Sequence, residues 1–385
     1  MHQMIGPKLG RVREMGARIS LVSNFVLDRR SHSGDQVPSL DGLRGLAVLM
    51  VVFGHMSRSG VHLHPRLDLV GLGTPGVYLF FVLSSFLLTR QLLAKDKREL
   101  ISARSWATYL LRRALRIYPL FITGLVLALL FPFIKQALIG PREVAFWQHL
   151  LVLEGQKIFW AIPVEVKFYL VLPFLVLVFV FLLGRRPLWA LVVTLSMVIA
   201  NDYLYPPAEQ LYRSIALRSY LSIFLWGYLA AILHSTFIDG RPSPTVRVLL
   251  DLSAVALFAG VVMATPSAIP SLSGWVRPAL GEAGYGLVWA LALLAYLKSD
   301  GLVSWVLARP VIRLVGVVSF SIYMWNLVII EWVRRAFWEV GGPAKVTVML
   351  AGIAVLSSVS YMAIERPLIR FGARASRHRI FDLSK

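Results

Sequence analysis

The sequence contains no cysteine, so it forms no disulfide, no thiolate metal site and no cysteine nucleophile. It also has little charge: Asp, Glu, Lys and Arg make up 16 % of the 385 residues, against roughly 25 % in soluble globular domains. No P-loop is present, which leaves ATP-driven chemistry without support. Neither an internal repeat nor a low-complexity linker divides the chain, so a single domain is expected.

Hydrophobic residues, in contrast, make up 57 % of the chain, and the mean hydropathy is positive. A bilayer core of about 30 Å requires roughly 20 mostly apolar residues per helical span. Because ten such segments can be placed, we predict an all-α integral membrane protein, a single bundle of about ten transmembrane helices. The segments are 40–57, 72–93, 114–134, 164–183, 187–203, 216–234, 246–265, 280–298, 311–332 and 344–364.

Positive charge is distributed unevenly between the two ends of these segments. Of the 40 Lys and Arg residues, more than twice as many fall on the side of the N-terminus as on the opposite side. The positive-inside rule then places both termini in the cytoplasm. Anionic headgroups explain the basic excess, so the expected partners are membrane lipids and not nucleic acid. Residues 1–38 and 368–385 are expected to form basic cytoplasmic tails around a membrane domain at 39–367, with no appended soluble domain.

The first predicted span, SLDGLRGLAVLMVVFGH, carries three ionisable side chains that lipid disfavours: Asp41, Arg44 and His55. Arg44 and His55 are close to three helical turns apart, so the two side chains share one helix face. Ionisable groups within a membrane usually face the bundle interior or a water-filled cavity, which favours a functional site. The alternative is structural: Arg44 would anchor the helix end at the membrane surface, and His55 would only hydrogen-bond a neighbouring helix.

The fourth predicted span contains FWAIPVEVKFYLVLPF, which brings Glu165 to a depth comparable with that of His55. A carboxylate beside an imidazole orients a general base and stabilises its protonated form. We therefore predict that Glu165 orients His55. The alternative is that Glu165 pairs with Lys167 or with a lipid headgroup.

Two arginines, Arg113 and Arg116, lie one turn apart in RRALRIYPL at the cytoplasmic start of the third predicted span. This arrangement suits phosphate, because guanidinium groups bind its oxygens in pairs and keep their charge. Simple anchoring of the span by positive charge is the alternative interpretation.

Hydroxyl and amide side chains enter two other spans. Ser84 reaches mid-depth in GVYLFFVLSSFLL, and Tyr323 and Asn326 lie in the outer half of VIRLVGVVSFSIYMWNLVII. These side chains can hydrogen-bond a hydroxylated acceptor. They serve equally well as contacts between helices in an ordinary bundle.

Together, these segments resemble the membrane acyltransferase 3 family, bacterial O-acyltransferases that modify surface polysaccharides and related molecules. The resemblance extends from residue 39 to residue 367, and its first motif is the most specific, because Asp, Arg and His recur at that spacing. The matching stretches are SLDGLRGLAVLMVVFGH at 39–55, GVYLFFVLSSFLL at 76–88, RRALRIYPL at 112–120, FWAIPVEVKFYLVLP at 159–173, VGVVSFSIYMWN at 315–326 and ERP at 365–367.

The resemblance implies a ten-helix bundle in the bacterial cytoplasmic membrane. It would take an acyl group from cytoplasmic acyl-CoA, with acetyl-CoA as the default donor, and deliver it to a hydroxyl of a cell-surface or lipid-linked carbohydrate. No metal is expected. His55 matches the family's essential first-helix histidine, and Arg44 matches its partner arginine. Arg113 and Arg116 match the pair assigned to the donor side, and Glu165 matches the acidic residue before the FYL motif.

Three positions depart from the family pattern. Ser85 replaces the glycine of the SGF ending of the second motif, and Ala161 and Ile162 replace the last two residues of a WSL motif. Asn326 stands where the ninth-span motif usually has a histidine. Because Asn cannot accept a proton at neutral pH, His55 is the sole histidine candidate in the site.

The sequence thus predicts a membrane O-acyltransferase. His55, oriented by Glu165, either deprotonates the acceptor hydroxyl or is itself acylated, and Ser84, Tyr323 and Asn326 line the acceptor side. The alternative is a multispanning transporter or flippase of a glycan or small molecule, since polar groups near the midplane of ten helices also suit alternating access. The inverted halves and paired broken helices that would favour a transporter are not visible in the sequence.

Overall fold

The structure is a computed structural model that describes residues 38–141, 143, 145–206, 214–237, 242–265, 270–299, 301–337, 339 and 341–377. Within these residues every regular element is a helix. The longer helices are α2 (Pro38–Arg58), α3 (Gly73–Leu93), α5 (Ala103–Leu130), α8 (Ala161–Leu177), α9 (Pro187–Leu204), α10 (Leu221–Phe237), α11 (Pro244–Met263), α12 (Pro270–Lys298), α15 (Ser319–Ala336), α16 (Gly342–Ser360) and α17 (Arg366–Arg377).

Shorter elements connect them: α4 (Lys97–Leu100), α6 (Pro132–Leu138), α7 (Phe146–Leu150), α13 (Leu302–Leu307) and α14 (Pro310–Val317). Two 3₁₀ turns, η1 (Lys157–Trp160) and η4 (Leu217–Ser219), precede α8 and α10. Two single π-helical turns, η2 (Val178–Leu182) and η5 (Tyr361–Glu365), follow α8 and α16 without a break.

The chain is an all-α, multi-pass membrane protein, and the ten predicted spans fall on its helices. Over the part of the chain that the structure describes, seven helical segments are long and apolar enough to cross a membrane. The number of spans rises to eight if the bent pair α14 and α15 is counted as one span. α10 has 17 residues, short for a span on its own. The predicted number of ten is therefore approximate.

Three boundaries differ from the prediction. The third span starts at Ala103 and not at 114, because its basic first turns continue the helix beyond the apolar stretch. The ninth span consists of two helices, α14 and α15, which are bent by 80° at Val318. The C-terminal tail predicted from 368 is helical as far as Arg377. The predicted N-terminal tail up to residue 37 and the stretch 378–385 lie outside the described residues.

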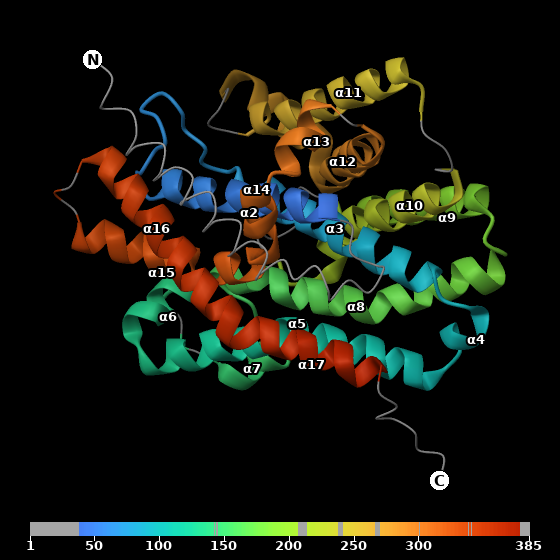
Figure 1. The fold of residues 1–385 in the computed structure, drawn as a ribbon, viewed down its shortest axis with the longest axis horizontal. Helices are drawn as coiled ribbons and strands as arrows, with labels where there is room; N and C mark the ends of the chain where they lie inside the picture. Colours follow the sequence, from blue (N-terminus) through green and yellow to red (C-terminus); the bar gives the residue numbers. More distant parts are fainter. Residues whose placement is uncertain are drawn as a thin grey trace, which may run out of the picture.

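Helices α2, α3 and α10 cross the middle of the bundle, as Figure 1 shows. α11, α12 and α13 lie on one side of them, and α5, α6, α7 and α17 lie on the other. Stacked aromatic rings join α3, α10 and α8: the ring centroid of Phe224 lies 4.6 Å from that of Phe81 and 4.1 Å from that of Phe168. Such stacked pairs add to the burial of apolar surface, so this core holds α8 against α3 at the level of Ser84 and Glu165.

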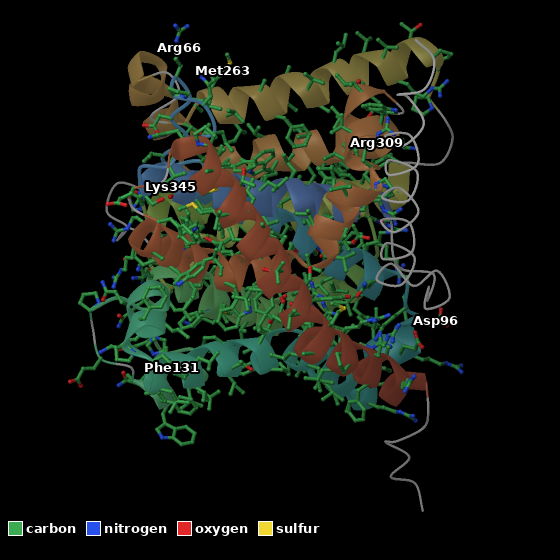
Figure 2. The ribbon with its side chains drawn as sticks, turned by 60° about the vertical axis from the view of Figure 1, so that its left-hand side comes forward. Arg66, Asp96, Phe131, Met263, Arg309 and Lys345 are labelled. Carbon is green, nitrogen blue, oxygen red and sulfur yellow. The ribbon has the colours of Figure 1, made fainter. Side chains whose placement is uncertain are left out.

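The bundle has two opposite ends, which six labelled side chains mark in Figure 2. Four side chains lie at one end, here called the Arg66 end: Arg66 and Phe131 follow α2 and α5, Met263 is the last residue of α11, and Lys345 is in the first turn of α16. Asp96, which follows the second span, and Arg309, which precedes the ninth, lie at the opposite end, here called the Asp96 end. The first three spans, and likewise the ninth and tenth, therefore run in alternating directions, as in a multi-pass membrane protein.

Helix α2 is in backbone contact with α13 and α14 through glycines. A Cβ atom added at Gly42 would lie 2.2 Å from the carbonyl oxygen of Leu307, and one at Gly45 would lie 2.4 Å from that of Ile312. From the other side, a Cβ at Gly316 would lie 1.7 Å from the carbonyl oxygen of Asp41. Small residues allow such close approach between membrane helices, so the glycines of the DGLRG stretch hold α2 in place.

We predict that Gly316→Ala lowers the stability of the bundle. The added methyl group forces α14 away from α2, and overpacking of this kind typically costs about 1–3 kcal/mol. Thermal unfolding of the detergent-purified protein, followed by tryptophan fluorescence, measures the effect. Gly260→Ala is the control, because a Cβ at Gly260 in α11 meets nothing within 4 Å. Equal melting temperatures for the two variants would contradict the assigned contact.

Candidate active site

A cavity of about 250 Å³ opens between α2, α3, α5, α8 and α15. Polar and charged side chains from all five helices line it, among them three arginines, and we call it the arginine cavity. Six of the eight predicted site residues line it: Arg44, Ser84, Arg113, Arg116, Glu165 and Tyr323. The other two predicted residues, His55 and Asn326, are not part of its lining.

The two arginines of α5 reach the cavity because a separation of three residues places them on one helix face. The Nε atom of Arg113 is buried and has no hydrogen-bond partner among the described residues. Arg116 lies opposite a carboxylate, with its Nη1 atom 3.7 Å from Oε2 of Glu365. Because a buried polar group without a partner is unfavourable, the Arg113 side chain is suited to receive an acceptor group from a ligand.

Two carboxylates of this site, Asp41 and Glu365, are not among the eight predicted site residues. Glu365, only 1 % exposed, pairs with Arg116 and accepts a hydrogen bond from the Ser321 hydroxyl. Asp41 lines the cavity, and its Oδ1 atom lies 3.9 Å from Nη1 of Arg44. A carboxylate within the apolar last span, in the ERP stretch, is the sequence signal that points to Glu365.

Glu165 belongs to a hydrogen-bonded group on the wall of the arginine cavity. Its Oε1 atom accepts hydrogen bonds from the Ser84 hydroxyl at 2.8 Å and from the Tyr169 hydroxyl at 2.5 Å. The Tyr109 hydroxyl in turn donates to the backbone carbonyl of Tyr169 at 3.1 Å. These bonds tie α8 to α3 and α5, and the Glu165 carboxylate faces Ser84 of α3.

His55 has a different partner: its Nδ1 atom lies 2.7 Å from Oδ1 of Asn326 on α15. The amide Nδ2 of Asn326 donates to the carbonyl oxygens of Ile322 and Tyr323 at 3.0 and 2.7 Å. Since both of these partners are acceptors, the amide orientation is determined, and it is the oxygen that faces His55. Nδ1 of His55 must then carry the proton and donate it to Asn326, which leaves the proton-accepting lone pair on Nε2.

The prediction that Glu165 orients His55 is therefore wrong, because the side chain that bonds and orients His55 is Asn326. A matched depth along two helices does not determine which faces of the helices meet. α15 packs on α2, whereas α8 packs on α3 and α5. Asn326 is completely buried, and its polar atoms are taken up by His55 and the backbone, so the structure does not place it in the lining of a cavity as an acceptor ligand.

A second cavity, of about 320 Å³, adjoins His55, and we call it the histidine cavity. It lies beyond the last turn of α2, between the start of η1 and the last turns of α15. Its lining residues are His55, Arg58, Ser59, Lys157, Leu327, Ile330, Glu331 and Arg334. The Tyr323 hydroxyl, in the arginine cavity, donates to the carbonyl oxygen of Ile158 at 2.6 Å, next to Lys157. Tyr323, which lines the arginine cavity, and Asn326, which bonds His55, are one helical turn apart on α15.

The three departures from the family pattern have different places in the structure. The Ser85 hydroxyl donates to the carbonyl oxygen of Phe224 at 2.7 Å, so Ser85 joins α3 to α10, and it lines neither of the two cavities described above. Ala161 and Ile162 line the arginine cavity. Asn326 holds His55, as described above. In the described part of the chain, no three His, Asp or Glu side chains are grouped so that they could hold a metal ion.

Comparisons with known proteins agree with the family resemblance of the sequence motifs. The family model of the acyltransferase domain Acyl_transf_3 matches residues 37–363 of the chain. O-acetyltransferase OatA of Staphylococcus aureus, from strain NCTC 8325 and from strain COL, is 25 % identical over 380 residues in both cases. Each match covers 90 % of this chain and 59 % of the relative, so the chain spans about three fifths of the length of these relatives. No solved structure matches the chain.

We predict that the Arg116–Glu365 ion pair stabilises the fold. Glu365→Gln leaves Arg116 without its countercharge and should lower the free energy of unfolding by about 1–3 kcal/mol, the range for coupled neighbours. Denaturation in mixed micelles measures the free energy of unfolding of the two single variants, Glu365→Gln and Arg116→Gln, and of the double variant. Glu99→Gln, at an exposed carboxylate of α4, is the control. Strictly additive losses in the double variant would contradict the pairing.

Proposed function

The chain belongs to the acyltransferase family of the Acyl_transf_3 domain, and on this premise we propose that it is a membrane O-acyltransferase. It transfers an acyl group, acetyl by default, from acyl-CoA to a hydroxyl group of a cell-surface or lipid-linked carbohydrate. The observation that carries the proposal is the combination of an arginine cavity with a histidine that Asn326 holds about three helical turns farther along α2. The OatA relatives, which are named O-acetyltransferases, support the acetyl group as the default.

The donor occupies the arginine cavity. Arg44, Arg113 and Arg116 bind the phosphates of coenzyme A, and the buried Nε atom of Arg113 gains a hydrogen-bond partner there. Arg44 and His55 are about 17 Å apart along α2, at 1.5 Å per residue. An extended phosphopantetheine arm has a similar length. Ser84, Glu165 and Tyr323 then border the arm, and the thioester passes Tyr323 to reach His55.

The chemistry depends on the tautomer of His55. Nε2 removes the proton from the acceptor hydroxyl, whose oxygen attacks the thioester carbonyl carbon. The new C–O bond forms, the C–S bond breaks, and the departing thiolate takes the proton back from the imidazolium. Asn326 keeps the other ring proton on Nδ1 throughout and stabilises the imidazolium by its oxygen, as the third member of a catalytic triad does. An acyl-histidine route would use the same Nε2 atom as the nucleophile.

The Asp96 end of the bundle faces the cytoplasm in this proposal, and the Arg66 end faces outward from a bacterial cytoplasmic membrane. The excess of Lys and Arg on the N-terminal side of the spans supports this orientation. Acyl-CoA then approaches the arginine cavity from the cytoplasm, while the acceptor approaches His55 from the outer side. The two substrates meet within the bundle without crossing it.

We predict that His55→Ala abolishes acetyl transfer, because general-base catalysis by a positioned side chain contributes roughly a hundredfold or more. The assay follows label from radioactive acetyl-CoA into the organism's envelope glycans and lipid-linked sugars, using protein reconstituted in nanodiscs. His64→Ala, in the exposed segment after α2, should transfer label at the normal rate. Normal turnover by the His55 variant would remove this residue from the mechanism.

We also predict that Arg113→Gln raises the KM for acetyl-CoA roughly tenfold, the effect of losing one hydrogen bond to a charged group. The turnover number should change little, because the lost contact is made equally in the ground state and in the transition state. Arg104→Gln, an exposed position on the same helix, is the matched control. A KM equal to that of the control would mean that Arg113 only anchors α5.

A further inference from the structure

The histidine cavity has an unbalanced set of charges. Three cationic side chains line it, Arg58, Lys157 and Arg334, together with a single carboxylate, Glu331. Three positive charges and one negative charge leave a formal excess of two positive charges. These cationic side chains lie near the Arg66 end of the bundle, where Lys and Arg are less frequent. The positive-inside rule, which places cations at the cytoplasmic face, therefore does not account for them.

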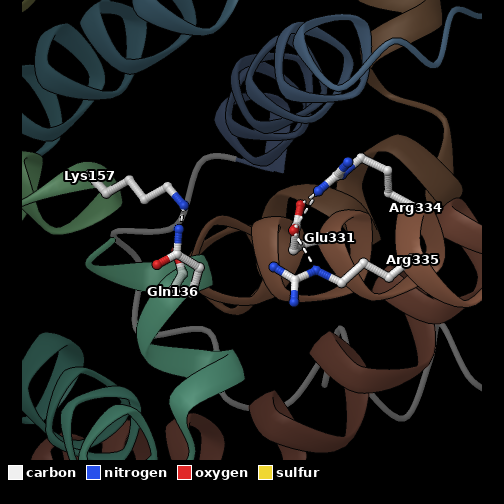
Figure 3. Close-up of polar contacts among 5 residues, drawn as sticks. All are labelled: Gln136, Lys157, Glu331, Arg334 and Arg335. Atoms are coloured by element: carbon white, nitrogen blue, oxygen red, sulfur yellow. Dashed lines mark hydrogen bonds and ion pairs between the residues drawn. The ribbon is translucent and has the colours of Figure 1, made fainter. Parts of the chain in front are cut away.

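The carboxylate of Glu331 is fully engaged, as Figure 3 shows. Arg334 donates to it from Nε at 3.0 Å and from Nη2 at 2.8 Å, and Arg335 donates from Nε at 2.7 Å. Glu331 therefore holds two guanidinium groups in place and neutralises only one of their charges. A guanidinium that is held in this way is preorganised for an anion, because little rotamer entropy remains to be lost on binding.

The other two cations, Arg58 and Lys157, line the cavity together with His55. Arg58 follows His55 by three residues on α2, so both project from one face of the helix end. Arg58 has no hydrogen-bond or ion-pair partner in the part of the chain that the structure describes. Lys157, at the start of η1, has a left-handed backbone (φ +52°) and donates from Nζ to the carbonyl oxygen of Gln136 at 2.6 Å. Figure 3 shows Lys157 beside Gln136, and Lys157 lines the cavity together with His55.

We propose that the histidine cavity recognises an acceptor that carries an anionic group, a carboxylate or a phosphate, close to the hydroxyl group that is acylated. This proposal rests on the proposed function, because it takes His55 as the group that activates the acceptor. Arg58, Lys157 and Arg334 bind the anion, and Leu327 and Ile330 provide an apolar wall for the face of a sugar ring. A neutral acceptor makes none of these charge-assisted hydrogen bonds and binds more weakly.

The test uses protein reconstituted in phosphatidylcholine nanodiscs, so that no anionic lipid headgroup competes for the cations. Envelope glycans and lipid-linked sugars of the organism are separated by anion exchange into a neutral and an acidic fraction. Each fraction is offered as the acceptor with radioactive acetyl-CoA. Part of the acidic fraction is first treated to reduce its carboxyl groups, and another part is treated with hydrogen fluoride to remove phosphate. The two treatments show whether the anionic group of the acceptor is a carboxylate or a phosphate.

We expect label in the acidic fraction, and we expect one of the two treatments to remove most of its acceptor activity. Arg58→Gln should raise the KM for the acidic acceptor by roughly tenfold or more, the effect of one lost charged hydrogen bond, and should leave the KM for acetyl-CoA unchanged. Arg66→Gln removes the same charge from the following segment, outside the cavity, and should transfer label normally.

Three results would overturn the proposal. Equal labelling of the neutral fraction, or acceptor activity that survives both treatments, would mean that the cavity does not select an anion, while the acyltransferase function would stand. A KM for the acidic acceptor that is the same in Arg58→Gln and Arg66→Gln would remove Arg58 from acceptor binding. No label in any fraction would contradict the proposed acyltransferase function itself, and with it this proposal.

Discussion

The close contact of α2 with α13 and α14 is the constraint on which the site depends. Glycines at 42, 45 and 316 bring these helices together at backbone distance, where any side chain would separate them. Because α2 carries Arg44 near one end and His55 near the other, this single packing arrangement sets the depth and the facing direction of both. The bend between α14 and α15 then returns Asn326 to α2, within hydrogen-bond distance of His55.

The charges of the bundle are arranged in two groups along α2. In the arginine cavity, Asp41 and Glu365 pair with two of the three arginines, and the buried Nε atom of the third, Arg113, has no hydrogen-bond partner among the described residues. In the histidine cavity, Glu331 is shared by two arginines. In the histidine cavity the cations outnumber the single carboxylate, whereas in the arginine cavity the three arginines lie beside three carboxylates, Asp41, Glu165 and Glu365. Both proposed substrates meet a guanidinium group, Arg113 in one cavity and Arg58 in the other, with donors that have no hydrogen-bond partner among the described residues.

Much of this organisation could be predicted from the sequence. Long apolar segments locate the spans, because hydrocarbon excludes any helix that exposes polar side chains. The arginines at 44, 113 and 116, placed together by pattern and resemblance, do line one cavity. The pairing of Glu165 with His55 was wrong, because residue spacing reports depth along a helix but not which neighbour a face meets. Glu365 was overlooked for the same reason, as its partner Arg116 is remote in the chain.

The sequence by itself determined the membrane location, the helical class and the residue types available for chemistry, because these follow from hydrophobicity, helical period and the absence of cysteine. Only the tertiary structure decided that Asn326 holds His55, that Ser85 faces α10, and that Arg58, Lys157 and Arg334 converge on one cavity. The physical reason is that these contacts join helices distant in sequence. Their geometry depends on how helices rotate and bend against one another, which no local pattern encodes.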